Sequence, residues 1–120
     1  MSPRRILVAF DGTEPAFRAL EQAAEIALAT DARVGVVTVL RPETVAAQQA
    51  ASYLVDKGLE PEVYTPVGDP AAEIRRVAED HEFDTVYLGT RGHGSLARAL
   101  EGSVSDTVAD TAGITVVIAR

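Results

Sequence analysis

Two short glycine-containing segments near the end of the chain carry residue types that bind phosphate groups. Gly89 and Gly92 frame a loop, and nine residues further on lies Gly102-Ser103-Val104-Ser105. Glycines let the backbone approach an oxyanion closely and adopt positive φ. The two serines add hydroxyl donors. These residue types at this spacing predict a phosphate-binding loop, although a glycine pair after a strand can also serve only as a turn.

The segments that flank this loop are expected to position it. Residues 85–88 form an apolar run that is typical of a buried strand, and residues 102–111 have the spacing of a helix. The start of a helix supplies unpaired N–H groups and a partial positive charge. A glycine-rich connection from a strand to a helix therefore favours an anionic ligand.

Strands and helices are expected to alternate along the whole chain. Apolar runs predict strands at residues 4–10, 34–40, 62–66, 85–88 and 115–119. Helices are expected to begin near Pro15, Pro42, Pro70 and Gly102. The buried face of the first helix is predicted to comprise Phe17, Leu20, Ala24, Ala27 and Leu28.

This alternation predicts an α/β fold with a doubly wound, five-stranded parallel sheet in the order 3-2-1-4-5. In such sheets the ligand lies at the carboxyl ends of the strands, near the point where the strand order reverses. Asp11, Val39 and Gly89 each lie at a predicted strand end. We therefore expect these three residues to converge on one site.

Composition limits the classes of function. The 120 residues are 47% hydrophobic, so we expect residues 1–120 to form a single domain. The net charge of −7 argues against nucleic-acid or anionic-membrane binding. The sequence lacks cysteine, a long apolar span and a signal-peptide pattern, which favours the cytoplasm. The acidic, lysine-poor composition fits either a high-salt cytoplasm or a GC-rich genome.

The spacing Gly-x2-Gly-x9-Gly-Ser also resembles the nucleotide-binding signature of the universal stress protein family. Residues 89–105 read GTRGHGSLARALEGSVS, with each glycine and the following serine in place. Residues 6–13, 36–39, 67–71 and 114–119 resemble further family segments. The likeness covers nearly the whole chain. It implies a Rossmann-like, adenine nucleotide alpha hydrolase-like fold that binds ATP in a stress-response regulatory protein.

The resemblance also implies roles for individual residues. Asp11 is expected to contact the nucleoside, although its carboxylate could equally cap the following turn. The backbone of Val39 is expected to form hydrogen bonds with the edge of the adenine base. Mg²⁺ or Mn²⁺ is expected to bind through the phosphates of the nucleotide. Arg91 could neutralise phosphate or lie in solvent. The predicted nucleotide-binding set is Ala9, Phe10, Asp11, Val39, Gly89, Arg91, Gly92, Gly102, Ser103, Val104 and Ser105.

The last strand predicts a homodimer. Residues 115–119 are apolar and uncharged, and the predicted strand order leaves them at a sheet edge. An open apolar edge favours aggregation, so pairing with the same strand of a second subunit would protect it. Universal stress proteins commonly dimerise in this way. The sequence does not identify any further protein partner.

Competing functions fit the sequence to different degrees. A receiver domain needs a lysine after the last strand, but Lys57 is the only lysine. A flavin binder needs a phosphate loop after the first strand, where Asp11 and Glu14 would repel phosphate. No catalytic residue is assigned, so at most slow ATP hydrolysis is expected. A dimeric protein-interaction module of the same fold that does not bind ATP remains the alternative.

Overall fold

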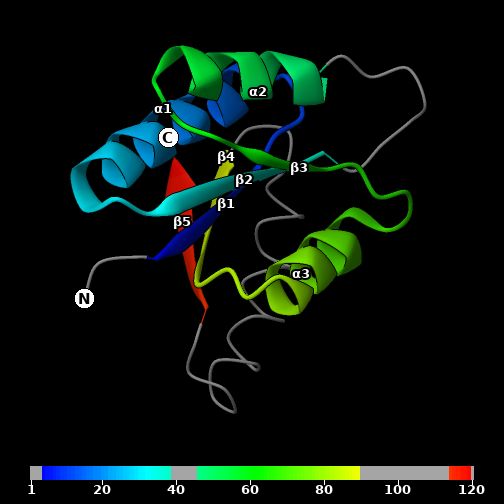
Figure 1. The fold of residues 1–120 in the computed structure, drawn as a ribbon. Coiled ribbons are helices and arrows are strands. Elements are labelled where there is room, and N and C mark those ends of the chain that lie inside the picture. The colour runs from blue at the N-terminus through cyan, green and yellow to red at the C-terminus, as the bar shows by residue number, and fades with distance from the viewer. Residues whose placement is uncertain (1–3, 39–45, 90–113, 120) are drawn as a thin grey trace.

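The computed structural model describes residues 4–38, 46–89 and 114–119 (Figure 1). Within them, strands and helices alternate as the apolar runs predict. The elements are β1 (Arg5–Ala9), α1 (Glu14–Thr30), β2 (Arg33–Val37), α2 (Ala46–Asp56), β3 (Glu62–Tyr64), α3 (Pro70–Asp80), β4 (Thr85–Gly89) and β5 (Thr115–Ala119). The predicted helix at residues 102–111 lies outside the described residues.

All five strands form one parallel sheet in the order β3-β2-β1-β4-β5, which confirms the predicted doubly wound topology. In the central strand, Ile6 pairs with Val34 of β2 on one side and with Thr85 of β4 on the other. The strand order reverses at β1. The carboxyl ends of β1, β2 and β4 therefore meet at one edge of the sheet, as the position of a ligand site in this topology requires.

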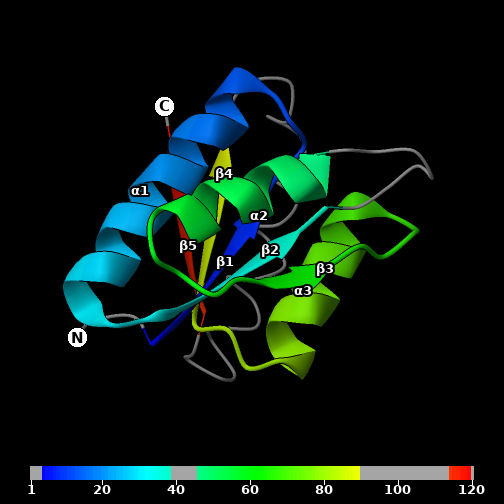
Figure 2. The same ribbon diagram turned by 45° about the horizontal axis from the view of Figure 1, so that its top comes forward.

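Helices cover both faces of the sheet. Helices α1 and α2 lie together on one face and α3 lies on the other (Figures 1 and 2). Ile6 and Val8 pack toward α1 and α2, whereas Leu7 between them packs toward α3. This alternation explains why β1 is a continuous apolar run, because a strand that is buried on both faces has no polar side.

Polar side chains cap the starts of α1 and α3. The Thr13 side chain caps α1 by accepting a hydrogen bond from the Ala16 N–H, and Asp69 caps α3 through the Ala72 N–H. A proline follows each cap within two residues. Proline suits the first turn because its missing N–H has no helical acceptor there.

Several predicted details differ in the structure, beginning with β1, which is one residue shorter at each end than predicted, and β4, which extends one residue further. Leu28 is 51% exposed, because the adjacent Ala27 faces the sheet and each helical residue turns the next by about 100°. Strand β3 ends at Tyr64, two residues before Pro66, which has no N–H to donate to a strand partner. Strand β2 begins at Arg33 and ends at Val37, so it starts one residue earlier than predicted and ends sooner.

Candidate functional site

The turn that follows β1 lies at the carboxyl edge of the sheet. Asp11 is exposed there, and its Oδ1 accepts hydrogen bonds from the Thr13 N–H at 3.0 Å and the Thr13 hydroxyl at 2.6 Å. Gly12 between them has φ +86°, a conformation that L side chains rarely adopt. The turn-capping role of Asp11 is therefore observed, and its contact with a nucleoside stays a prediction.

Phe10 contributes to the core more than to the surface of this edge. Its side chain is 2% exposed and packs edge-to-face on Phe17, with ring centroids 5.0 Å apart. Its N–H donates to the Val37 carbonyl at 3.0 Å, which extends the pairing of β1 with β2. This N–H is used within the sheet. The predicted backbone contact of Phe10 with a base would therefore have to use the Phe10 carbonyl. Ala9 ends β1 and is half-buried.

Gly89 has a packing reason to be glycine that the sequence did not reveal. It ends β4 and is buried, and a Cβ atom there would lie 2.6 Å from the Pro15 carbonyl carbon and 2.7 Å from the Ala16 nitrogen. Both atoms are backbone, so they cannot move aside as a flexible side chain would. The first turn of α1 thus packs directly on the end of β4, close to the turn that carries Asp11.

Most of the predicted phosphate-binding residues lie outside the described part of the chain. This applies to Val39, Arg91, Gly92, Gly102, Ser103, Val104 and Ser105. Of the predicted set, the structure places Ala9, Phe10, Asp11 and Gly89, and brings them to the carboxyl ends of the adjacent strands β1 and β4. The strand pairing thus places Asp11 and Gly89 at neighbouring strand ends, and the predicted convergence of Asp11, Val39 and Gly89 on one site stays a prediction.

Thr38 is a polar residue at the same edge that sequence reasoning missed. It follows β2 directly and is 3% exposed, yet its hydroxyl has no hydrogen-bond partner among the residues that the structure describes. Its N–H donates to the Tyr64 carbonyl at 3.0 Å. The only signal in the sequence is one hydroxyl residue at the end of the valine-rich run from residue 34.

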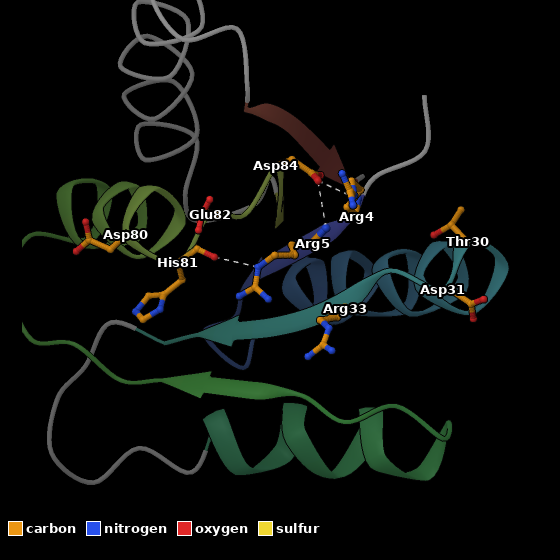
Figure 3. Close-up of a pocket in the computed structure, with 9 residues that line it drawn as sticks. All are labelled: Arg4, Arg5, Thr30, Asp31, Arg33, Asp80, His81, Glu82 and Asp84. Carbon is orange, nitrogen blue, oxygen red and sulfur yellow. Dashed lines mark hydrogen bonds between the residues drawn. The ribbon is translucent and has the colours of Figure 1, made fainter.

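A polar hollow lies at the opposite, amino-terminal edge of the sheet (Figure 3). Asp84 holds the start of β1 there, because its Oδ2 accepts hydrogen bonds from the N–H groups of Arg4 at 2.8 Å and Arg5 at 3.2 Å. The hollow is lined by Arg4, Arg5, Thr30, Asp31, Arg33, Asp80, His81, Glu82 and Asp84. Cations and carboxylates are nearly equal in number around it, so it presents no clear preference for an anion.

Arg5 organises a network that spans three strands at this amino-terminal edge. Its guanidinium pairs with the Glu62 carboxylate at 2.9 Å and lies 4.5 Å from the centre of the Phe83 ring. Gly35 of β2 lies beneath that ring, and a Cβ there would lie 2.5 Å from Phe83 Cζ. The missing side chain of Gly35 therefore leaves room for the end of the Phe83 ring. The Tyr64 hydroxyl completes the network by donating to Glu62 at 2.6 Å.

The ionisation of Glu62 and Tyr64 is perturbed in opposite directions. The hydrogen bond from the Tyr64 hydroxyl and the nearby Arg5 lower the pKa of Glu62, against the opposing effect of burial. Burial, and then the hydrogen bond to the Glu62 carboxylate, raise the pKa of Tyr64 to about 12. The network is therefore most stable when Glu62 is charged and Tyr64 is neutral.

This network makes stability sensitive to alkaline pH. The folded chain holds the Tyr64 proton more tightly than the unfolded chain, in which tyrosine has a pKa of about 10. The stabilisation is therefore complete below pH 10 and is lost as the pH rises toward 12. We expect the free energy of unfolding, measured in urea between pH 9 and 11.5, to fall more steeply for the wild type than for Tyr64→Phe. Equal slopes would contradict this account of the network.

Two further findings concern the described residues. Residues 4–38, 46–89 and 114–119 contain no group of three or more histidine, cysteine or carboxylate residues placed to hold a metal ion. In the same ranges, no helix is long and apolar enough to span a membrane.

The strand order and the helices on both faces define this chain as a Rossmann-like α/β protein. A family model described as the universal stress protein family matches residues 3–62 and 44–120. The chain therefore belongs to the universal stress protein family, as the glycine signature predicts. No curated protein sequence matches the chain significantly.

Solved structures of the family share this fold. A universal stress protein from Archaeoglobus fulgidus in complex with dAMP is 25% identical, with a TM-score of 0.80 and 100% of both chains covered. A universal stress protein in complex with cAMP is 26% identical, with a TM-score of 0.75 and coverage of 100% of this chain and 98% of that chain. A family protein from Arabidopsis thaliana with AMP bound is 18% identical, with a TM-score of 0.63 and coverage of 98% and 91%, which shows the fold alone.

Proposed function

We propose that this chain is a cytoplasmic regulatory protein of the stress response that binds ATP through a single domain of residues 1–120. The observation that carries the proposal is the intact signature of residues 89–105 in a member of the universal stress protein family. Relatives of 25% and 26% identity have been solved with dAMP and cAMP, so an adenine nucleotide is the ligand class that the family likeness supports.

The proposed site extends along the carboxyl edge of the sheet. The nucleoside would lie near Asp11 and Val39, at the ends of the first two strands. The phosphates would lie beyond Gly89, at the serines and backbone N–H groups of residues 102–105, where a helix start favours anions. Mg²⁺ or Mn²⁺ would bind mainly to phosphate oxygens and water. The proposal assigns no catalytic residue, so ATP turnover is expected to be slow or absent.

Calorimetric titration of Asp11 variants with ATP tests this site. Asp11→Ala should weaken binding by about 1 to 3 kcal/mol, because it removes a charged hydrogen-bond partner of the nucleoside. Asp11→Asn is the matched control, because its carbonyl oxygen can still accept from Thr13 and keep the turn. A nucleoside contact predicts that Asp11→Ala weakens adenosine binding but not triphosphate binding. Equal affinities of the wild type and Asp11→Ala for ATP would exclude the contact.

We also propose a homodimer that forms through β5. Among the strands that the structure describes, β5 pairs with β4 on one side and with none on the other, and its residues carry no charge. Antiparallel pairing with the β5 of a second subunit would satisfy the exposed backbone groups by two-fold symmetry. The family likeness supports this arrangement.

The oligomeric state of Val117→Lys tests the dimer. Val117 lies in the middle of β5, so the substitution should bring two lysines close together across the two-fold axis and shift the protein toward monomer. Light scattering at micromolar concentration should show a dimer for the wild type and a monomer for the variant. Because Val117 also packs partly on the core, the variant's melting curve must show a folded protein. A wild-type monomer would overturn the proposal, and a dimeric variant would place the interface elsewhere.

A further inference from the structure

We propose that the hydroxyl group of Thr38 contacts the nucleoside portion of the bound nucleotide. This inference rests on the proposed function and adds a recognition residue to the same site. Thr38 is 3% exposed, and its Oγ1 finds no hydrogen-bond partner within the described part of the chain. Buried hydroxyl groups in proteins are nearly always hydrogen-bonded, so one without a partner calls for an explanation.

Packing does not explain why this residue is threonine. The other residues near the end of β2, Val36 and Val37, are valines with almost no exposed surface. Valine has nearly the shape of threonine, and it would fill the same space without burying an unpaired polar group. Within the described part of the chain the hydroxyl has no partner to offset the cost of burying it, as is expected of a group whose partner is a ligand.

The position of Thr38 is fixed by the sheet. Its N–H donates to the Tyr64 carbonyl of β3 at 3.0 Å, and the preceding Val37 carbonyl accepts from the Phe10 N–H of β1 at 3.0 Å. The residue is thus held at the carboxyl edge, one strand away from the turn that carries Asp11. A rigid backbone gives a recognition group a defined direction before the ligand arrives.

The strand order indicates which part of a nucleotide Thr38 would meet. Neighbouring strands lie about 4.8 Å apart, and two such steps separate β2 from β4. Thr38 is therefore about 10 Å from the end of β4, where the predicted phosphate loop begins. That separation matches a contact with the base or ribose, beside Asp11, and it excludes a direct contact with phosphates that are bound next to Gly89.

The test is to replace Thr38 with valine and to measure both stability and binding. Without ligand, the melting temperature of Thr38→Val should rise by about 2 to 5 °C, because the unpaired hydroxyl is gone. Its affinity for ATP and for adenosine should fall about three- to tenfold, the usual effect of one lost hydrogen bond. Tripolyphosphate binding should not change. Thr38→Ser keeps the hydroxyl and should bind both ATP and adenosine within about twofold of the wild type.

Thr85 offers a matched control on β4. It is also a buried threonine, but it lies at the amino-terminal end of its strand, and its hydroxyl donates to the Asp84 carboxylate at 2.8 Å. Thr85→Val should therefore lower the melting temperature and leave nucleotide affinity unchanged. The two variants make the same chemical change with opposite expected effects on stability.

The outcomes separate this inference from the proposed function. If the wild type binds ATP and Thr38→Val binds it equally tightly, the inference is wrong and the proposed function stands. If Thr38→Val melts at a lower temperature than the wild type, the hydroxyl is bonded within the protein, which also overturns the inference. If the wild type binds neither ATP nor adenosine, the proposed function itself fails.

Discussion

Replacing Gly102 with valine should abolish ATP binding and leave the fold intact. Gly102 is the third glycine of the signature and directly precedes the predicted phosphate-binding serine. A branched side chain there would occupy the space that the phosphates need, because close approach to an oxyanion requires the bare backbone of glycine. Calorimetric titration should show no saturation by ATP.

Two controls make the result for Gly102→Val specific. A melting temperature close to that of the wild type would show that the loss is local. Adenosine, which lacks phosphates, should keep more of its wild-type affinity than ATP does. Unchanged ATP affinity in Gly102→Val would refute the phosphate site, whatever the behaviour of the nucleoside.

Replacing Gly89 with alanine should instead destabilise the fold itself. The new Cβ would lie 2.6 Å from the Pro15 carbonyl carbon and 2.7 Å from the Ala16 nitrogen, so the first turn of α1 would have to move away from β4. Overpacking in a core costs about 1 to 3 kcal/mol, and contact with backbone atoms places this site at the upper end. The melting temperature should fall by about 10 °C.

Gly58 provides the matched control for Gly89→Ala. Its φ is +88°, but a Cβ there would meet no atom within 4 Å, so Gly58→Asn should cost little because asparagine tolerates the left-handed region. Thermal unfolding of both variants compares the loss of stability caused by a steric clash at Gly89 with that caused by a side chain at positive φ at Gly58. If Gly89→Ala melts within about 2 °C of the wild type, the close packing of α1 on β4 is wrong.

The topology could be predicted because it depends on patterns that are local in sequence. The apolar run at β1 indicates a strand buried on both faces, and Pro15 and Asp69 mark helix starts whatever their neighbours are. The predictions failed where the burial of a residue depends on its neighbours in space. Leu28 continues an apolar pattern, but it lies one helical step away from the buried Ala27 and is 51% exposed.

The candidate site could be predicted in outline but not in its packing. That Asp11 and Gly89 lie at the carboxyl ends of adjacent strands follows from parallel strands in a known order. The reason that Gly89 is glycine depends on the approach of the α1 backbone. That the Thr38 hydroxyl lacks a partner among the described residues depends on what surrounds it in three dimensions. The pairing of Arg5 with Glu62 likewise depends on the register across β2, which a single sequence does not contain.

Titration of the purified chain with ATP, with and without Mg²⁺, tests the central claim most directly. Our account predicts saturable binding of one nucleotide per chain. It also predicts a melting temperature that rises with ligand concentration, because a ligand at a hundred times its dissociation constant stabilises a protein by about 2.7 kcal/mol. The absence of both saturable heat and a thermal shift, with ATP at millimolar concentration and a correctly folded protein, would contradict it.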